Sequence, residues 1–188
     1  MLAFSNRLLS GFRAQLQRFR KDERGVSVIE FTLVIPIMAI LAVGSWELTK
    51  AVMTKRKNSN LATSVANLAA QDDSITDSDW ATFEDIADKI LFPYNNFAHR
   101  LGLIAVEVDK NGKLKEVCSY GDADIQTSEL PAALRINNSF YIMTASEVDY
   151  LAFTKDAKFY GMNSGVTDMT FRDIAIFAPR NSDEISCD

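Results

Sequence analysis

The sequence has little of the chemistry that metal proteins and nucleotide-binding enzymes use. It contains two cysteines, Cys118 and Cys187, and a single histidine, His99. No cysteine or histidine pair has the spacing of a zinc site. The eight glycines are scattered rather than gathered into a phosphate-binding loop. The sequence therefore predicts no bound metal and no cofactor.

Catalytic motifs are equally scarce. A Ser-His-Asp arrangement would have to use His99, and the best serine candidate, Ser119, has no Gly-x-Ser-x-Gly motif around it. Three acidic pairs lack the spacing of a calcium loop: Asp72-Asp73, Glu84-Asp85 and Asp122/Asp124. Such pairs are typical of a solvated surface. We expect no enzyme activity.

Charge is distributed unevenly along the chain. The net charge is −5, yet residues 1–25 hold six basic and two acidic residues, whereas residues 47–188 hold 14 basic and 22 acidic ones. A basic head, an apolar span and an acidic body are typical of a membrane-anchored protein. The acidic part has no basic patch with interleaved aromatics, so nucleic acid is not an expected partner.

The apolar span runs from Val26 to Trp46 and has Glu30 as its only charge. At 1.5 Å per residue, these 21 residues reach about 31 Å, which matches a hydrocarbon core of about 30 Å. A buried helix of a soluble protein is rarely apolar all round for this length. A cleaved secretory signal ending at Ala42-Val43-Gly44 is an alternative, although such signals have shorter apolar regions. The pattern favours a transmembrane helix.

The flanks of the span indicate its orientation. Six basic residues precede it and four follow closely, at Lys50, Lys55, Arg56 and Lys57. This bias favours a cytoplasmic N-terminus, with the C-terminal part on the opposite side of the membrane. Apolar residues of the leader fall on one face, as in a helix lying on an anionic leaflet: Leu8, Leu9, Phe12, Leu16 and Phe19. A disordered basic tail is the alternative.

A carboxylate inside lipid is costly, so Glu30 is expected to have a partner. If the chain were cut after Gly25, the new amine of Val26 would be largely protonated near neutral pH. Glu30 lies four residues from it, about one helical turn, and could neutralise this amine or that of a neighbouring subunit. The alternative is an interfacial acid that reaches the headgroups.

These residues match a family pattern. The string "RGVSVIEFTLVIPIMAILAVGSWEL" resembles the TadE-like pseudopilins of tight-adherence (Flp-type) pilus systems, and the distal part of the chain is similar more loosely. The resemblance implies that Gly25 is the last leader residue and Val26 the first mature one. It also implies that Glu30-Phe31 is the acid–aromatic pair used in assembly. A membrane-embedded prepilin peptidase would make the cut. Because glycine has no side chain, the backbone at Gly25 could approach the active site of this peptidase closely.

Pro36 lies within the span. It leaves the carbonyl of Thr32 without its helical donor and should bend or loosen the helix there. Beyond the membrane, the helix is predicted to continue to residue 71, with a break around Asn58–Asn60 as the alternative. Residues 26–71 would then form a pilin-like spine of about 69 Å.

The rest of the chain, residues 72–188, is predicted to form a periplasmic α+β domain. A helix over about 78–91, capped by Ser78 or Asp77, follows an acidic linker and ends before Pro93. Residues 103–120 form a hairpin around Asn111-Gly112, and residues 139–153 and 168–178 form two longer strands. One helix and a mostly antiparallel sheet therefore follow the long N-terminal helix.

The two cysteines are expected to form a disulfide if this domain lies in an oxidising periplasm. A Cys118–Cys187 bridge would close a loop of about 70 residues and would stabilise a domain of this size. Two unpaired thiols are the alternative.

The resemblance implies that the chain is a minor pseudopilin of the bacterial inner membrane, with a cleaved leader at residues 1–25 and its C-terminal domain in the periplasm. Its expected partners are the prepilin peptidase, other pilins and pseudopilins, the pilus assembly platform and the lipid bilayer. The alternative is an uncleaved single-pass protein that carries a periplasmic binding module or enzyme. A secreted soluble domain is a third interpretation.

Overall fold

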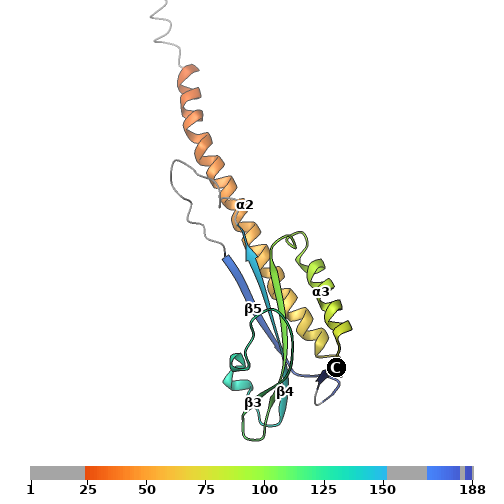
Figure 1. Ribbon diagram of the computed structural model, residues 1–188. Coiled ribbons are helices and arrows are strands. Elements are labelled where there is room, and N and C mark those ends of the chain that lie inside the picture. The colour runs from red at the N-terminus through yellow and green to blue at the C-terminus, as the bar shows by residue number, and fades with distance from the viewer. Residues whose placement is uncertain (1–23, 152–168, 183–184, 188) are drawn as a thin grey trace, which may run out of the picture. The chain divides into compact units, whose positions relative to one another are not determined.

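The computed structural model describes residues 24–151, 169–182 and 185–187 (Figure 1). The chain divides into two compact units, Met1–Trp46 and Glu47–Asp188. The first helix of the described residues, α2 (Arg24–Ala69), has 46 residues and contributes to both units. It confirms the long N-terminal helix expected from the sequence. The compact unit that contains the sheet begins at Glu47, within the predicted helix of residues 26–71.

Helix α2 has no break at residues 58–60, where the sequence allowed one. Asn58 is completely buried, and its side-chain amide donates to the carbonyl oxygens of Ser146 (2.9 Å) and Phe171 (3.0 Å). An asparagine weakens a helix when its side chain competes for nearby backbone groups. Here that side chain is used in tertiary contacts, so the helix continues.

Helix α3 (Asp77–Leu91) has its cap one residue before Asp77, the earlier of the two predicted caps. The N-cap is Thr76, not Ser78 or Asp77: its hydroxyl accepts from the Asp79 amide, and the Asp79 carboxylate accepts from the Thr76 amide at 3.0 Å. The Thr76 hydroxyl also donates to the Asp79 carboxylate at 2.7 Å, and this bond, together with the one from the Thr76 amide, lowers the pKa of Asp79. The reciprocal capping box decides the start. Phe83, Ala87 and Leu91 form the buried face of the helix.

The main sheet has four antiparallel strands in the order β3-β2-β4-β5. Their bounds are His99–Val108 (β2), Leu114–Gly121 (β3), Ser139–Tyr150 (β4) and Met169–Phe177 (β5). The predicted hairpin is confirmed: Gly112 has φ 74°, and its amide donates to the Asp109 carbonyl at 2.8 Å. The last residues of the predicted 139–153 strand lie outside the described residues.

A second, two-stranded sheet was not predicted. Strand β1 (Ser74–Ile75) pairs in parallel with β6 (Ser186–Cys187). The pair brings the C-terminal end of the chain to the linker that precedes α3. Two residues per strand give almost no sequence signal, because periodicity needs a longer run.

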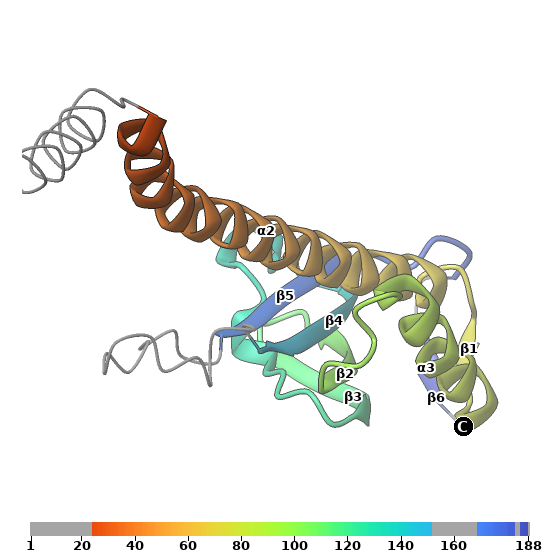
Figure 2. The same ribbon diagram turned by 90° about the horizontal axis from the view of Figure 1, so that it is seen from above.

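The two faces of the main sheet are covered differently. Part of α2 and α3 pack on one face, and Figure 2 shows α2 running alongside β5 and β4. Leu61, Leu103 and Ile142 lie in this core and are completely buried. The opposite face carries Ile104, Val106 and Met143, which pack against Leu130. Both faces of the central strands are therefore buried.

The segment over this second face contains two short 3-10 helices, η1 (Thr127–Glu129) and η2 (Ala132–Leu134). Arg172 on β5 binds it, donating to both carboxylate oxygens of Glu129 at 2.8 Å and to the Asp124 carbonyl at 2.7 Å. The Arg172 guanidinium lowers the pKa of Glu129. These polar contacts attach an irregular segment that hydrophobic periodicity did not predict.

Candidate functional site: the apolar segment of α2

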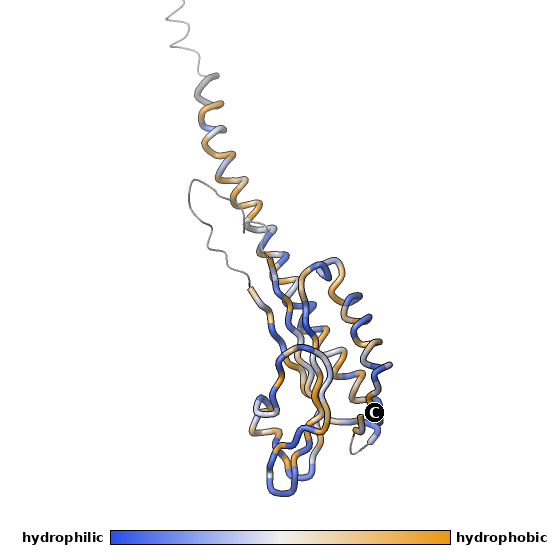
Figure 3. The backbone as a smooth tube through the Cα atoms, viewed as in Figure 1, coloured by the Kyte–Doolittle hydropathy of each residue, from blue (hydrophilic) through white to orange (hydrophobic). Residues whose placement is uncertain are grey.

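The described side chains of residues 28–46 are exposed on every side of the helix. Phe31 is 65% exposed, Leu41 64% and Trp46 68%. Figure 3 shows apolar residues recurring throughout this segment, and Glu30 is its only charged residue. The helix is long and apolar enough to cross a membrane. In a water-soluble monomer, an exposed apolar surface of this extent would be unusual.

The predicted cleavage residues, Gly25 and Val26, lie at the N-terminal end of α2, which begins at Arg24. The leader before residue 24 lies outside the described residues. Val26 and Glu30 both belong to α2, and residues four apart in a helix are neighbours on its surface. Glu30 and Phe31 are exposed. The backbone thus has the spacing that the charge-pairing hypothesis requires, whereas cleavage and pairing stay predictions.

Helix α2 continues on both sides of Pro36. The hydroxyl of Thr32, one turn earlier, donates to the carbonyl of Val28 at 2.7 Å. The carbonyl of the same residue, Thr32, has no helical donor, because Pro36 lacks a backbone N–H. The bend predicted at Pro36 stays a prediction.

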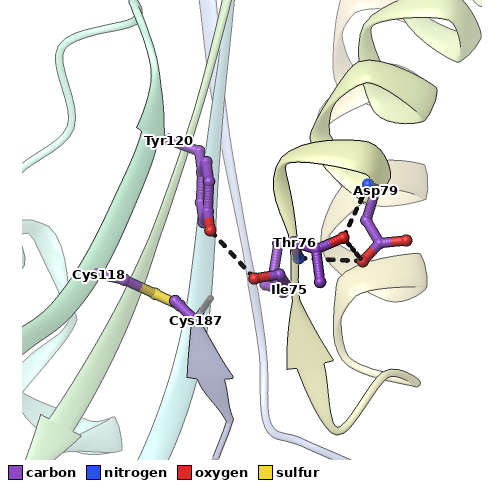
Figure 4. Close-up of a disulfide and its surroundings, with 6 residues drawn as sticks. All are labelled: Ile75, Thr76, Asp79, Cys118, Tyr120 and Cys187. Atoms are coloured by element: carbon purple, nitrogen blue, oxygen red, sulfur yellow. Dashed lines mark hydrogen bonds between the residues drawn. A yellow bond between two sulfur atoms is a disulfide. The ribbon is translucent and has the colours of Figure 1, made fainter.

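Cys118 on β3 and Cys187 on β6 are at disulfide distance, with their Cα atoms 6.3 Å apart (Figure 4). Next to this pair, the Tyr120 hydroxyl donates to the Ile75 carbonyl at 3.0 Å. The Tyr120 ring also stacks on Trp80, with ring centroids 5.8 Å apart. The disulfide and Tyr120 together attach the small β1–β6 sheet to the edge of the main sheet.

A contact that the sequence did not predict joins Glu47 to Tyr150 at the end of β4. The Tyr150 hydroxyl donates to the Glu47 carboxylate at 2.8 Å, and Lys50 lies 3.5 Å from that carboxylate. Tyr150 is 2% exposed, and its burial, together with the bond to Glu47, raises its pKa well above the ordinary value. The two residues are 103 positions apart, so no local pattern could indicate the pair.

Buried polar groups lie where α2 packs on the sheet. In addition to the Asn58 amide bonds, the Ser146 hydroxyl donates to the Asn58 side-chain oxygen at 2.6 Å. The hydroxyls of Thr54 and Thr144 are buried and have no hydrogen-bond partner among the described residues. We call Thr54, Asn58, Thr144 and Ser146 the polar seam. It makes this packing specific in register, because a shift would separate Asn58 from its partners.

The residues weighed for enzyme chemistry do not assemble into a recognisable site. His99 has its Nε2 atom 3.7 Å from an oxygen of Asp88, and both line an open, acidic groove of about 640 Å³ with Glu84 and Asp122. Ser119 lies on β3, outside the residues that line this groove. In the described ranges, no group of three or more histidine, cysteine or acidic side chains is arranged to hold a metal ion.

The chain matches no family model, no curated protein sequence and no solved structure. The resemblance to TadE-like pseudopilins stays a prediction from the sequence.

Proposed function

We propose that this chain is a minor pseudopilin, similar to the TadE-like proteins, that is cleaved after Gly25 and takes part in assembling a tight-adherence (Flp) pilus. The observation that carries the proposal is the segment 28–46 of α2, which is apolar on every side and has one acid near its start. A membrane anchor needs only the apolar length. An anchor does not need Glu30, the acid at the fifth position after Gly25, whereas a pseudopilin does.

Glu30 supplies the chemistry of assembly. Once the leader is removed, the Val26 ammonium and the Glu30 carboxylate are separated by one helical turn. Each is costly alone in lipid, and pairing lowers that cost. If the partner amine belongs to a neighbouring subunit, the same pairing sets the axial position of one helix against the next. Phe31 adds an exposed ring, 65% accessible, beside this position.

The leader and the disulfide support a topology. The leader's six basic residues favour a cytoplasmic N-terminus. The domain from Glu47 onward then faces the periplasm, an oxidising compartment in which a Cys118–Cys187 bridge persists. Cleavage removes the basic leader, with all six of its basic residues, and leaves the apolar segment free to move from lipid into a pilus. The prepilin peptidase, other pilins and the assembly platform are the partners in this scheme.

The proposal is tested by the N-terminus of the protein extracted from membranes of cells with and without the prepilin peptidase. With the peptidase, intact mass and N-terminal sequencing should show a chain that starts at Val26; without it, the chain should retain residues 1–25. Gly25→Leu should block the cut. Gly44→Leu is the matched control, because a Cβ atom added at Gly44 would meet no atom within 4 Å.

Other outcomes identify the competing functions. A start at Ser45 that Gly44→Leu abolishes would indicate a secretory signal. A start at Met1 in both strains, together with normal function of Glu30→Ala, would indicate an uncleaved anchored module. A pseudopilin should instead lose surface pili with Glu30→Ala while remaining cleaved and in the membrane.

A further inference from the structure

The depth of Glu47 follows from its place in the chain. This inference depends on the membrane span proposed above, which ends at Trp46. Headgroups add about 5–7 Å to each side of the hydrocarbon core, or roughly four residues of helix. Glu47 to Lys50 therefore lie in the headgroup layer, whatever the orientation of the rest of the domain.

Tyr150 must lie at that same depth. Its hydroxyl donates to the Glu47 carboxylate at 2.8 Å and also lies 3.3 Å from the Glu47 carbonyl oxygen. The end of strand β4 is thus held at the level of the headgroups. Leu151, the next residue, is 45% exposed, and Met169, the partner of Tyr150 on β5, is also 45% exposed.

The loop after α3 lies at the same end of the domain. Phe97 packs edge-on against Tyr150, with ring centroids 5.3 Å apart, and Tyr94 stacks on Phe97. The Asp149 amide donates to the Ala98 carbonyl at 2.8 Å. Phe92, at the start of this loop, is 66% exposed. Tryptophan and tyrosine rings are enriched at membrane–water interfaces because they are apolar with a polar tip, and Tyr94 is of this type.

Exposed apolar side chains are concentrated at this end. Of the large hydrophobic residues that are exposed in the described part of 47–188, six lie in residues 48–53 of α2, in the loop after α3 or beside Tyr150, and two lie elsewhere. The six are Leu48, Val52, Met53, Phe92, Leu151 and Met169; the two are Val117 and Ile136. Exposed Lys55 and Arg56 follow on α2 and supply positive charge toward anionic headgroups.

We propose that Leu48, Phe92, Leu151 and Met169, together named the juxtamembrane face, contact the headgroup layer of the bilayer. The occupant is lipid, because the face is continuous with the membrane span and the Glu47–Tyr150 bond fixes it at headgroup depth. The domain is therefore attached to the membrane at two places: through its helix and through this face. The half-buried Glu47–Tyr150 hydrogen bond is the positioning contact that connects them.

The test places a nitroxide spin label on single introduced cysteines in the full chain. The protein is reconstituted in liposomes of phosphatidylethanolamine and phosphatidylglycerol. The native cysteines are paired, so the oxidised wild-type chain serves as the unlabelled blank. Labels at Phe92→Cys and Leu151→Cys should collide with oxygen severalfold more, relative to a water-soluble nickel complex, than a label at Ile136→Cys. Ile136 is the matched control, at 61% exposure against 66% for Phe92.

A label at Leu41→Cys reports on the span itself. If Leu41→Cys contacts lipid while the labels at 92 and 151 behave like the one at 136, the juxtamembrane face is free in water. The inference then fails, although the anchor stands. If Leu41→Cys is also in water, the membrane span fails and the inference fails with it. Labels at 92 and 151 that are shielded from both oxygen and nickel would show a protein partner instead of lipid. Met169→Cys replaces either variant that fails to fold.

Discussion

Helix α2 has two parts, residues 28–46 and residues 54–69. The first part is the more apolar of the two, but only the second has buried side chains. Residues 28–46 are almost entirely apolar, and their described side chains are exposed. Residues 54–69 include threonine, serine and asparagine, and yet seven of their side chains are buried: Thr54, Asn58, Leu61, Ala62, Val65, Ala66 and Ala69. The seven recur at intervals of three and four residues, which is one face of a helix.

This difference shows that hydropathy alone does not tell which part of a helix forms a protein core. The less apolar part is buried because a sheet covers one of its faces. The more apolar part is exposed on every side, which is stable only with another apolar environment around it. That requirement is why we propose a bilayer, and later neighbouring pilin helices, around residues 28–46.

A leucine-to-alanine substitution should have a large effect on the free energy of unfolding in the buried part of α2 and a small effect in the exposed part. Leu61→Ala removes a completely buried side chain and should lower the free energy of unfolding of the domain by about 2–5 kcal/mol. Leu41→Ala, at a residue 64% exposed, should change it by less than about 0.5 kcal/mol. Urea unfolding in mild detergent, followed by Trp80 fluorescence in a Trp46→Phe background, measures both. Equal effects would mean that residues 28–46 also pack on the domain.

The disulfide should stabilise the sheet-containing unit alone. Reduction opens a loop between residues 69 positions apart and should lower the free energy of unfolding of the domain by about 2–4 kcal/mol. Trp80 fluorescence should report this loss, whereas Trp46, in a Trp80→Phe background, should not respond to reductant. The control is the Cys118→Ser/Cys187→Ser chain. A shift on adding reductant to that control would assign the effect to something other than the bridge.

The polar seam gives the smallest of the three effects. Asn58→Ala leaves the carbonyl of Ser146 and its hydroxyl without their asparagine partner, at a cost of about 1–3 kcal/mol. Asn60→Ala, two residues away at an exposed position, should stay within about 0.5 kcal/mol. The same urea measurement applies. If Asn58→Ala is as mild as Asn60→Ala, the seam does not fix how α2 packs on the sheet.

Much of the fold was predictable because its elements have long periodic patterns. The helix that ends at Ala69, the helix that ends at Leu91 and the hairpin at Gly112 all agree with the sequence. The N-cap was assigned to the wrong residue because threonine, serine and aspartate are all good caps. Only the geometry of Thr76 and Asp79 distinguishes among the candidates. The cover over the second sheet face was missed because its 3-10 turns have three residues each.

The local features can be inferred from the residues alone: an apolar segment of membrane length, its one acid, the two cysteines and the α+β order of elements. Contacts between residues distant in the chain depend on how the elements pack. The tertiary structure brings Tyr150 to Glu47, Asn58 to Ser146 and the C-terminal β6 to β1. The reason is physical: periodicity reflects the burial of one element's own face, whereas a single long-range hydrogen bond leaves no repeating pattern in the sequence.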